Sequence, residues 1–280
     1  MNYKNFRIRV FKKASLCRNF ENQVYYHLQN KHIKIPTYMS AGQEYIPATI
    51  SEIVKDKKPA LFAQHRAHST YLSYGGDITK LIDELFGLKT GCAYGMGGSA
   101  SIHCPKIKMF GHDGLMGSQV PISVGYCYSS REPTISIMGD ASAEEDYVLG
   151  ALGWASTKNL PMLFVVEDNN LSILTEKKVR RNWEMHDVAR AFNLAGHNIT
   201  DDPIDIFNHS ENIFKKPMLL NINTHRLYWH AGAGIDSHET FDRYKVEMHL
   251  LGSEAVEIHE ETKDIVKKIW KRQLEKQLNR

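Results

Sequence analysis

Three short apolar segments set the strongest constraint on how this chain can fold. They span residues 134–138, 162–166 and 218–222, and they are apolar almost throughout rather than alternating. Strands of this kind are typical of parallel sheets, because helices cover both faces of such sheets. Residues 120–129 and 143–157, on either side of the first segment, have the composition and length of helices. The sequence therefore predicts an α/β fold with a parallel sheet and helices on both faces.

Apolar residues also recur at helical spacing near both ends of the chain. One stripe continues from the start until Pro36 interrupts it, and another occupies the last part of the sequence. We therefore expect an N-terminal helical arm over residues 1–40, an α/β domain over 41–250 and a C-terminal helix over 251–280.

The composition argues against several classes of partner. The net charge is +3, with both signs mixed along the chain, which does not indicate a nucleic-acid surface. The sequence has no apolar stretch of bilayer length and no recognisable signal peptide. Its four cysteines form no Cys-x-x-Cys pair, as expected for reduced thiols. We expect a cytoplasmic protein that acts on a small molecule and binds neither nucleic acid nor membrane.

A glycine-rich segment precedes the first predicted strand. Eight glycines lie between Gly87 and Gly117, both included. Glycine lets a backbone approach other groups closely and adopt conformations that side chains disfavour. This density predicts a loop that wraps tightly around another part of the structure or around a ligand.

Polar side chains follow two neighbouring predicted strands. Asp140 comes directly after the first strand and Asn169 ends the second. The carboxyl ends of neighbouring parallel strands meet at one edge of a sheet, where ligands bind. Mg²⁺ prefers such oxygen ligands, and it takes the rest of its shell from phosphate and water. The turn after Asp140 leads into a predicted helix, whose free N–H groups favour phosphate.

A simpler interpretation exists for each of these residues alone. Asp140 can act only as a helix cap, and Asn169-Asn170 can form only a turn. Their combination, with a helix, Leu160-Pro161 and an apolar strand between them, is much more specific.

This combination resembles the thiamine-diphosphate motif, usually Gly-Asp-Gly followed by Asn-Asn. Motifs from about Phe11 to Tyr244 narrow the resemblance to the alpha chain of two-chain 2-oxo acid dehydrogenases, the group of the pyruvate, branched-chain and acetoin enzymes. These motifs are Arg18-Asn-Phe-Glu21, Gly42-Gln-Glu44, His65-Arg-Ala-His68, Glu84-Leu-Phe-Gly87, Gly95-Met-Gly-Gly-Ser99 and Gly114-Leu-Met-Gly-Ser-Gln119. The implied fold is the thiamine-diphosphate-binding α/β fold.

The resemblance implies a set of metal and diphosphate ligands. The side chains of Asp140 and Asn169 and the carbonyl of Leu171 would bind Mg²⁺. Arg66 would bind the diphosphate, and His65 stands where the family usually has a tyrosine in the same role. Arginine is always charged and can hold phosphate with two parallel hydrogen bonds.

Further cofactor contacts follow from the same comparison. Ala141 and Ser142 would offer backbone N–H groups to phosphate oxygens. Gly114 and Met116 would contact the aminopyrimidine, with Met116 as the apolar wedge that keeps the cofactor bent.

Histidines supply the candidate proton-transfer groups. His230 matches the active-site histidine on the loop that closes over the diphosphate, and Arg226 matches an arginine near that loop. His68 is a second catalytic candidate. A histidine with a near-neutral pKa suits proton transfer. The simpler interpretation is that each is a structural or exposed histidine.

Several positions depart from the family pattern. Ala141 replaces a glycine, and its methyl group is tolerable if the backbone φ is negative. Gly150 and Gly153 lie inside the predicted crossover helix, where each costs about 1 kcal/mol relative to alanine. We therefore expect both glycines to pack closely against a neighbouring segment. These changes indicate a divergent member of the group.

The leading hypothesis is an alpha subunit of an enzyme that depends on thiamine diphosphate and Mg²⁺. It would decarboxylate a 2-oxo acid and transfer the resulting acyl or aldehyde unit. The resemblance implies a separate beta-type subunit in a two-plus-two heterotetramer, and a lipoyl-bearing acyltransferase as a further partner.

Three alternatives remain open at this point. One is a transketolase-like or carboligating pair that passes a two-carbon unit to a sugar or aldehyde. Another is a non-catalytic binding homologue, for which Ala141, Gly150 and His65 are the arguments. A nicotinamide-binding sheet is the weakest, because no Gly-x-Gly-x-x-Gly follows an apolar strand.

Overall fold

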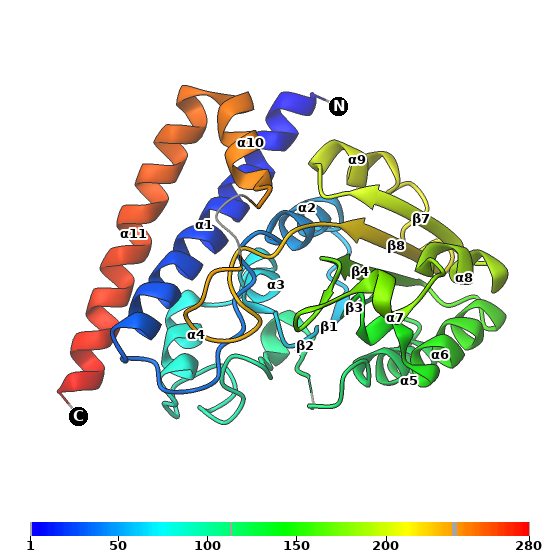
Figure 1. Cartoon of the computed structure of the whole chain (residues 1–280), viewed down its shortest axis with the longest axis horizontal. Helices are drawn as coiled ribbons and strands as arrows, with labels where there is room; N and C mark the ends of the chain where they lie inside the picture. Colours follow the sequence, from blue (N-terminus) through cyan, green and yellow to red (C-terminus); the bar gives the residue numbers. More distant parts are fainter. Residues whose placement is uncertain (1, 113, 237–239, 280) are drawn as a thin grey trace.

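A parallel sheet lies at the centre of the molecule (Figure 1). The computed structural model describes residues 2–112, 114–236 and 240–279, and within them this sheet has six strands in the order β2-β1-β3-β4-β8-β7. Every neighbouring pair is parallel. The strands are β1 (Ala60–Phe62), β2 (Met109–Phe110), β3 (Thr134–Gly139), β4 (Met162–Asp168), β7 (Ala195–Thr200) and β8 (Met218–Asn223). The predicted α/β fold is confirmed, and the three apolar segments form its adjacent central strands β3, β4 and β8.

Helices surround this sheet, and a short antiparallel hairpin, β5 (Leu171–Ser172) and β6 (Thr175–Glu176), follows β4. None of the described helices is both long and apolar enough to cross a membrane. The α-helices are α1 (Tyr3–Gln29), α2 (Tyr45–Ile53), α3 (His68–Ser73), α4 (Ile78–Leu85), α5 (Gln119–Ser130), α6 (Asp146–Thr157), α7 (Lys177–Arg180), α8 (Met185–Ala191), α9 (Pro203–Asn208), α10 (Arg243–Leu251) and α11 (Ser253–Leu278). The predicted division at residues 40 and 250 stays a prediction.

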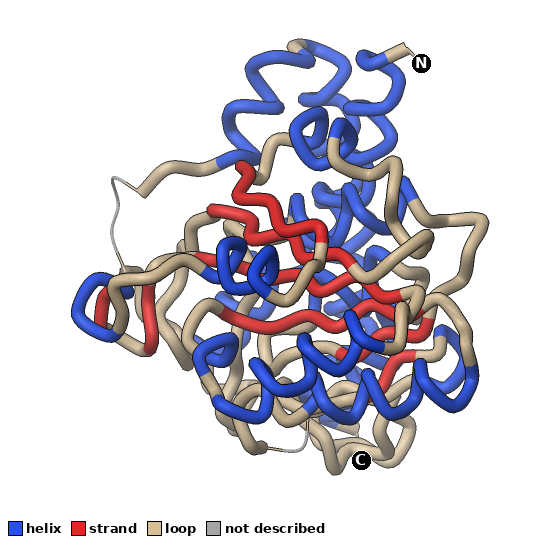
Figure 2. Tube along the Cα trace, turned by 90° about the vertical axis from the view of Figure 1, so that its right-hand side faces the viewer, coloured by secondary structure: helices blue, strands red, loops and turns tan. Residues whose placement is uncertain are grey.

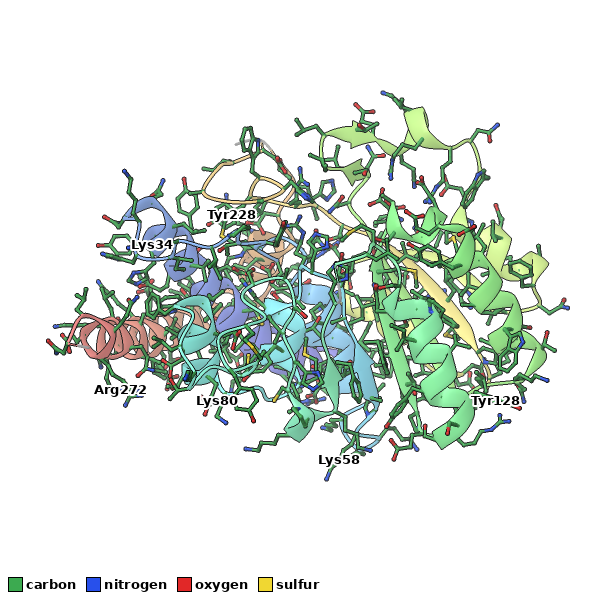
Figure 3. The ribbon with its side chains drawn as sticks, turned by 90° about the horizontal axis from the view of Figure 1, so that it is seen from below. Lys34, Lys58, Lys80, Tyr128, Tyr228 and Arg272 are labelled. Atoms are coloured by element: carbon green, nitrogen blue, oxygen red, sulfur yellow. The ribbon has the colours of Figure 1, made fainter. Side chains whose placement is uncertain are left out.

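Helices lie on both sides of the strands (Figure 2), and alternation of side chains along the central strands builds one core on each face of the sheet. Ile135 and Ile137 of β3 belong to a core shared with α1, α2, α3, α4 and α11. Met138 belongs to a second core shared with α5, α6 and α8. Both faces are therefore apolar, which explains why these strands do not alternate in sequence. The two helical layers reach opposite ends of the molecule, as Arg272 of α11 and Tyr128 of α5 show in Figure 3.

The long helices α1 and α11 lie side by side (Figure 1). Trp270 of α11 is fully buried and stacks on His27 of α1, with 4.5 Å between the ring centroids. Nδ1 of His27 lies 2.9 Å from Nδ1 of His32. Burial, with the neighbouring charge of His32, lowers the pKa of His27 to about 4. The contact between the two helices therefore requires a neutral histidine.

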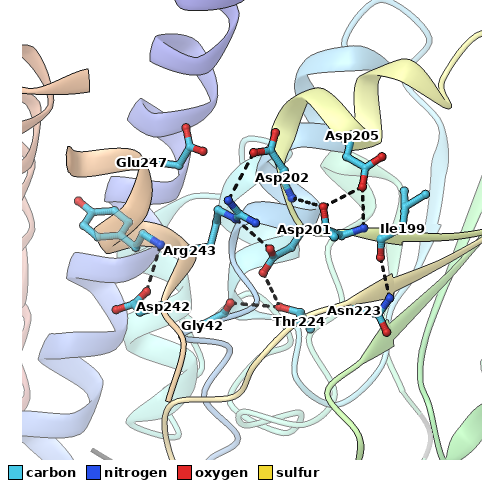
Figure 4. A network of polar contacts seen from close by, with 12 residues as sticks. Gly42, Ile199, Asp201, Asp202, Asp205, Asn223, Thr224, Asp242, Arg243 and Glu247 are labelled. Carbon is cyan, nitrogen blue, oxygen red and sulfur yellow. Dashed lines mark hydrogen bonds and ion pairs between the residues drawn. The ribbon is translucent and has the colours of Figure 1, made fainter. Parts of the chain in front are cut away.

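A polar network attaches the end of the sheet to α10 (Figure 4). The Nε group of Arg243 donates to Asp201, just after β7, at 2.9 Å. The hydroxyl of Thr224, just after β8, donates to Asp201 at 3.1 Å and is 3.2 Å from the carbonyl of Gly42. These contacts fix the start of the segment that continues from Thr224 toward Arg226.

The glycine-rich segment wraps around one carboxylate. Glu84 of α4 accepts four backbone N–H groups at 2.7–3.0 Å, from Ala93, Gly95, Gly97 and Gly98. A Cβ atom on Gly91 would lie 2.3 Å from Oε2 of Glu84. Any side chain at Gly91 would therefore displace the carboxylate that organises the loop. The tight loop predicted from the glycines therefore wraps around the carboxylate of Glu84, a group of the protein itself.

We predict that mild acid weakens the packing of α11 against α1. Because the folded-state pKa of His27 lies below the ordinary value of 6.5, the unfolded chain binds the proton more readily. This stabilisation is complete above pH 6.5 and is lost as the pH falls toward about 4. The expected loss between pH 7 and pH 4.5 is about 2 kcal/mol, less than the full shift implies because pH 4.5 still lies above the folded-state pKa.

Urea unfolding followed by tryptophan fluorescence at pH 7 and pH 4.5 measures this loss. His27→Phe keeps an aromatic ring against Trp270 and removes the titration, so its stability should change less with pH. His249→Phe, at an exposed position of α10, should behave like the parent chain. Equal pH dependence in His27→Phe and the parent would show that His27 is not responsible.

Candidate active site

A cavity of about 300 Å³ lies at the carboxyl ends of the central strands. It collects side chains from the loops after β1, β3, β4 and β8. Ten of the twelve predicted site residues line it: His65, Arg66, Met116, Asp140, Ala141, Ser142, Asn169, Leu171, Arg226 and His230. Gly114 and His68 are outside the lining. The structure thus brings together residues that are up to 165 positions apart in the sequence, from His65 to His230.

The two strand ends meet at this cavity as predicted. Gly139 of β3 is paired with Glu167 of β4, so Asp140 and Asn169 leave the sheet at the same edge. The side-chain amide of Asn169 donates to Gln43 at 2.9 Å, and its Oδ1 accepts the N–H of Leu171 at 3.0 Å. These bonds orient the amide oxygen toward the loop that carries the Leu171 carbonyl.

Asp140 is engaged in an ion pair that sequence patterns do not indicate. Arg180 of α7 donates to its Oδ2 and also lies 3.1 Å from Glu144. The neighbouring Arg181 donates to the Asp140 carbonyl at 3.0 Å. Burial raises the pKa of Asp140, the nearby Asp168 adds to this, and Arg180 opposes it. A cation therefore already compensates the charge of this carboxylate.

The donor set fits Mg²⁺ better than a softer metal. Within the described residues, no group of three or more His, Cys, Asp or Glu side chains is placed to hold a metal. A metal here would draw on a carboxylate, an amide oxygen and a backbone carbonyl, with phosphate and water completing the shell. That combination is typical of Mg²⁺ bound together with a phosphorylated ligand.

His65 and Arg66 form one polar wall of the cavity, in which Arg66 carries the positive charge. Arg66 is buried and donates to the carbonyls of Met39 at 2.6 Å and His230 at 3.3 Å. Both ring nitrogens of His65 are buried without a hydrogen-bond partner among the described residues. Burial, with the charge of Arg66, lowers the pKa of His65 to about 2, so the ring is neutral. Unpaired buried polar atoms are costly, and a polar ligand in this cavity would satisfy them.

The turn after β3 accommodates the substitution at Ala141. Its φ is −74°, so the methyl group meets no backbone strain and the expected tolerance is confirmed. The helix begins later than predicted, because a single 3-10 turn over Ser142–Glu144 precedes α6. The N–H groups nearest the cavity therefore belong to this turn and not to the first turn of a long helix.

The expectation for the two helical glycines is half right. Gly153 packs on Phe192, since a Cβ atom added to this glycine would lie 3.4 Å from the ring. Gly150 is exposed, and a Cβ atom there would meet nothing within 4 Å. Packing within this chain therefore explains Gly153 and does not explain Gly150.

Met116, Arg226 and His230 complete the lining. Met116 is 37% exposed, and its carbonyl accepts the hydroxyl of Tyr147. Arg226 is buried, pairs with Asp236 and donates to the Ile173 carbonyl at 2.9 Å. Burial and then the charge of Arg66 lower the pKa of His230. A neutral His230 ring can accept a proton.

His68 lies behind the cavity wall in a buried relay. Its Nδ1 is 3.1 Å from the carboxylate of Glu21, and its Nε2 is 2.9 Å from the hydroxyl of Ser99. The order carboxylate, histidine, serine is that of a nucleophilic triad, but all three residues are at most 1% exposed. Ser99 also accepts the N–H of Tyr38 at 2.9 Å. With both nitrogens engaged, His68 is placed to position the loop that carries Tyr38, and its catalytic role stays a prediction.

Six lining residues were not among the predicted site residues, and Glu167 is the most informative. It is buried and accepts the side-chain amides of Gln64 and Gln43. Burial raises its pKa to about 7. Its position at the end of an apolar strand was a usable signal, since charged residues are rarely buried without a partner. The six are Gln64, Gly139, Glu145, Glu167, Ser172 and Ile173.

The fold places this chain in the structural class of the thiamine-diphosphate-binding α/β fold, which transketolases share. The chain aligns over 96% of its length with transketolases from Leishmania mexicana (TM-score 0.59, 13% identity) and Pichia stipitis (TM-score 0.57, 14% identity). It spans less than half of those two chains, 47% and 46%. At such identities the similarity shows the fold alone.

The chain belongs to the dehydrogenase E1 component family, whose model matches residues 12–247. Pyruvate dehydrogenase E1 component alpha subunits are among its relatives. The protein from Rickettsia typhi is 26% identical over 80% of this chain and 72% of its own length, and that from Rickettsia bellii is 26% identical over 85% and 78%. The protein is thus a divergent alpha-type member of the thiamine-diphosphate-dependent 2-oxo acid dehydrogenases.

We predict that His68→Leu destabilises the fold. The substitution leaves the buried carboxylate of Glu21 and the hydroxyl of Ser99 without their shared partner, which should cost about 2–3 kcal/mol. Thermal and urea unfolding measure the loss, and His103→Leu, at an exposed position, is the matched control. If His68 instead exchanged protons with a substrate, turnover would fall while the free energy of unfolding stayed unchanged.

Proposed function

We propose that this chain is the alpha subunit of an enzyme that decarboxylates a 2-oxo acid with thiamine diphosphate and Mg²⁺, and transfers the resulting acyl unit. The observation that carries the proposal is one cavity that gathers Asp140, Asn169, Arg66 and the unpartnered ring of His65 in a chain of this family. The cofactor's thiazolium ring, when bound, takes up the electrons released by decarboxylation.

Different residues of the chain would bind the metal ion and the diphosphate of the cofactor. Asp140, Asn169 and the Leu171 carbonyl supply oxygen ligands for Mg²⁺, which would replace Arg180 as the cation next to Asp140. Arg66 supplies fixed positive charge for the diphosphate, and the neutral His65 ring supplies a hydrogen-bond donor. The backbone of Ala141 and Ser142 faces the same cavity. Preorganised donors in a dry site act strongly because they need no reorganisation.

His230 is the residue best placed to transfer protons. It lines the cavity, and its backbone carbonyl is held by Arg66 at 3.3 Å. Its ring lies 5.5 Å from that of Tyr38 and 5.6 Å from that of His65, measured between centroids. The lowered pKa keeps it neutral near pH 7, so it can accept a proton and return it to the transferred unit. Met116 supplies an apolar contact beside the entrance.

A separate beta-type subunit completes the proposed enzyme, in a two-plus-two heterotetramer. The relatives are named as alpha subunits, and one helical face of this chain is suited to a partner. Gly125 of α5 and Gly150 of α6 have open space around them. Ile122, Tyr128 and Trp154, on the same two helices, are 43–53% exposed. Exposed aromatic residues beside glycines allow another chain to approach closely.

A lipoyl-bearing acyltransferase is the proposed acceptor of the acyl unit. The family match supports this acceptor over the carboligating alternative, because the resemblance to transketolases concerns the fold only. Asp140, Arg66, Asn169 and His230 in one cavity argue against a non-catalytic homologue, since burying charged and polar groups is costly and brings no benefit where no ligand binds.

We predict opposite effects of two substitutions at the metal position. Asp140→Ala should weaken Mg²⁺-dependent thiamine diphosphate binding by about 100-fold, because it removes the anionic metal ligand. Arg180→Gln should tighten Mg²⁺ binding by about fivefold, because it removes the competing cation.

Isothermal calorimetry measures the binding of thiamine diphosphate and of Mg²⁺ by both variants. Trp183, which lies 4.8 Å from Arg181, offers a fluorescence signal. Lys178→Gln, on the same helix with a side chain 77% exposed, should change nothing. Unchanged cofactor binding in Asp140→Ala would refute the proposed site.

We also predict that the chain is nearly inactive alone and gains activity with a beta-type chain. Gly150→Leu should leave the fold intact, because the position faces open space, but should block assembly by steric conflict. Light scattering after size-exclusion chromatography measures assembly, and Glu257→Leu, at an exposed position of α11, is the control. Full turnover by the isolated chain would overturn the two-chain proposal. Normal assembly of Gly150→Leu would place the interface elsewhere.

A further inference from the structure

A second cavity, of about 540 Å³, lies at the opposite edge of the sheet. It is formed where the chain enters β1, at the ends of α2 and α3, and beside the 3-10 turn Pro105–Ile107. Figure 3 shows Lys58, from its lining, on the side of the molecule opposite Tyr228, which adjoins His230 of the first cavity. The two cavities are therefore separate sites.

The lining of this second cavity is strongly cationic. It includes five lysines and no acidic residue: Lys13, Lys55, Lys58, Lys106 and Lys108. Glu52 lies 3.6 Å from Lys13 and 3.0 Å from Lys55, and Glu132 lies 3.0 Å from Lys108. Lys58 and Lys106 have no ion pair within the part of the chain that the structure describes. Two carboxylates beside five ammonium groups leave a positive excess.

The rest of the lining offers mainly apolar contact. Val54 and Pro59 supply apolar walls. The hydroxyl of Ser51 accepts from Lys13 and donates to the carbonyl of Ala48, both at 2.9 Å, and that of Ser73 lies 3.6 Å from Sγ of Cys17. These hydroxyls are therefore engaged within the protein, and the lysines are the polar groups left to meet a ligand.

We propose that this second cavity binds a phosphate-bearing small molecule of nucleotide size. Several lysines converging on one concave site match a multiply charged anion, for which lysine acts as a point charge. The volume lies within the range of small-molecule sites. The apolar walls match the organic part of such a molecule. A concave shape favours a compact ligand over an extended acidic peptide.

The placement of the cavity indicates that its ligand is distinct from the substrate. Strand β1 connects the two sites, because Pro59 lines the second cavity and Gln64, just after the strand, lines the first. Helix α3 runs from His68, which lies behind the wall of the first cavity, to Ser73 in the lining of the second. Short rigid elements therefore separate a bound anion from the cofactor position.

Calorimetric titration of the full chain with ADP tests the proposal, with thiamine diphosphate and Mg²⁺ present to fill the first cavity. The variant Arg66→Gln, which alters the proposed diphosphate ligand of the first cavity, is titrated in parallel and should still bind ADP. The test of the second cavity therefore does not depend on the proposed cofactor.

The double variant Lys58→Gln/Lys106→Gln should weaken ADP binding by about tenfold or more. The matched double variant Lys34→Gln/Lys80→Gln, at two exposed lysines outside this cavity (Figure 3), should stay within about twofold. Inorganic pyrophosphate should bind, and adenosine should not.

Four results would overturn the proposal. The first is no binding of ADP or pyrophosphate at concentrations of about 1 mM. The second is equal weakening in both double variants, which would indicate nonspecific attraction to a basic surface. The third is loss of ADP binding in Arg66→Gln, which would place the nucleotide in the first cavity. The fourth is tighter binding of an acidic peptide than of ADP, which would make the surface a protein-docking site. Thermal unfolding of each variant confirms that it is folded.

Discussion

The parallel pairing of β3 with β4 is the constraint on which the rest of the structure depends. It places Gly139 opposite Glu167, so that Asp140 and Asn169 emerge together at one edge of the sheet. The pairing is held by apolar side chains on both faces, where the two cores contain residues from each strand. A slip of one residue would exchange the faces and disperse the oxygen ligands.

Buried carboxylates organise the loops around this edge. Glu84 holds four N–H groups of the glycine-rich segment, and Glu21 accepts the backbone N–H of Ser40 at 2.7 Å while it orients His68. Loops carry many backbone groups without partners in helices or strands, and one ionised side chain can satisfy several of them. Glu84 and Glu21 therefore order loops behind the cavity without being part of its lining.

The first cavity has the electrostatics of a site prepared for a charged ligand. Arg180 supplies positive charge where a metal ion would bind Asp140, and His65 keeps two buried nitrogens without partners. Glu167 is buried beside the positively charged Arg66, which lowers its pKa, although burial dominates and raises it overall. The ion pair at Asp140 and the unpartnered nitrogens of His65 are provisional or unfavourable in the protein alone, and the proposed anionic ligand with its cation would relieve both.

The sequence by itself determined the central part of the fold and most of the lining of the first cavity. Continuous apolar segments identified β3, β4 and β8, because a strand that is buried on both faces is apolar at nearly every position. It did not reveal β1 or β2, which are only three and two residues long. Nor did it reveal β7, whose sequence Ala-Gly-His-Asn-Ile-Thr is mixed because it lies at the edge of the sheet.

Tertiary structure alone decided which predicted residues face the cavity and which protein groups they contact. The spacing of His65-Arg-Ala-His68 could not show that His68 turns to Glu21, 47 positions away, while His65 and Arg66 reach the cavity. The ion pair between Arg180 and Asp140 and the open space at Gly150 are equally invisible in sequence. Secondary structure leaves a periodic signal along the chain, whereas contacts between distant segments depend on how the elements pack.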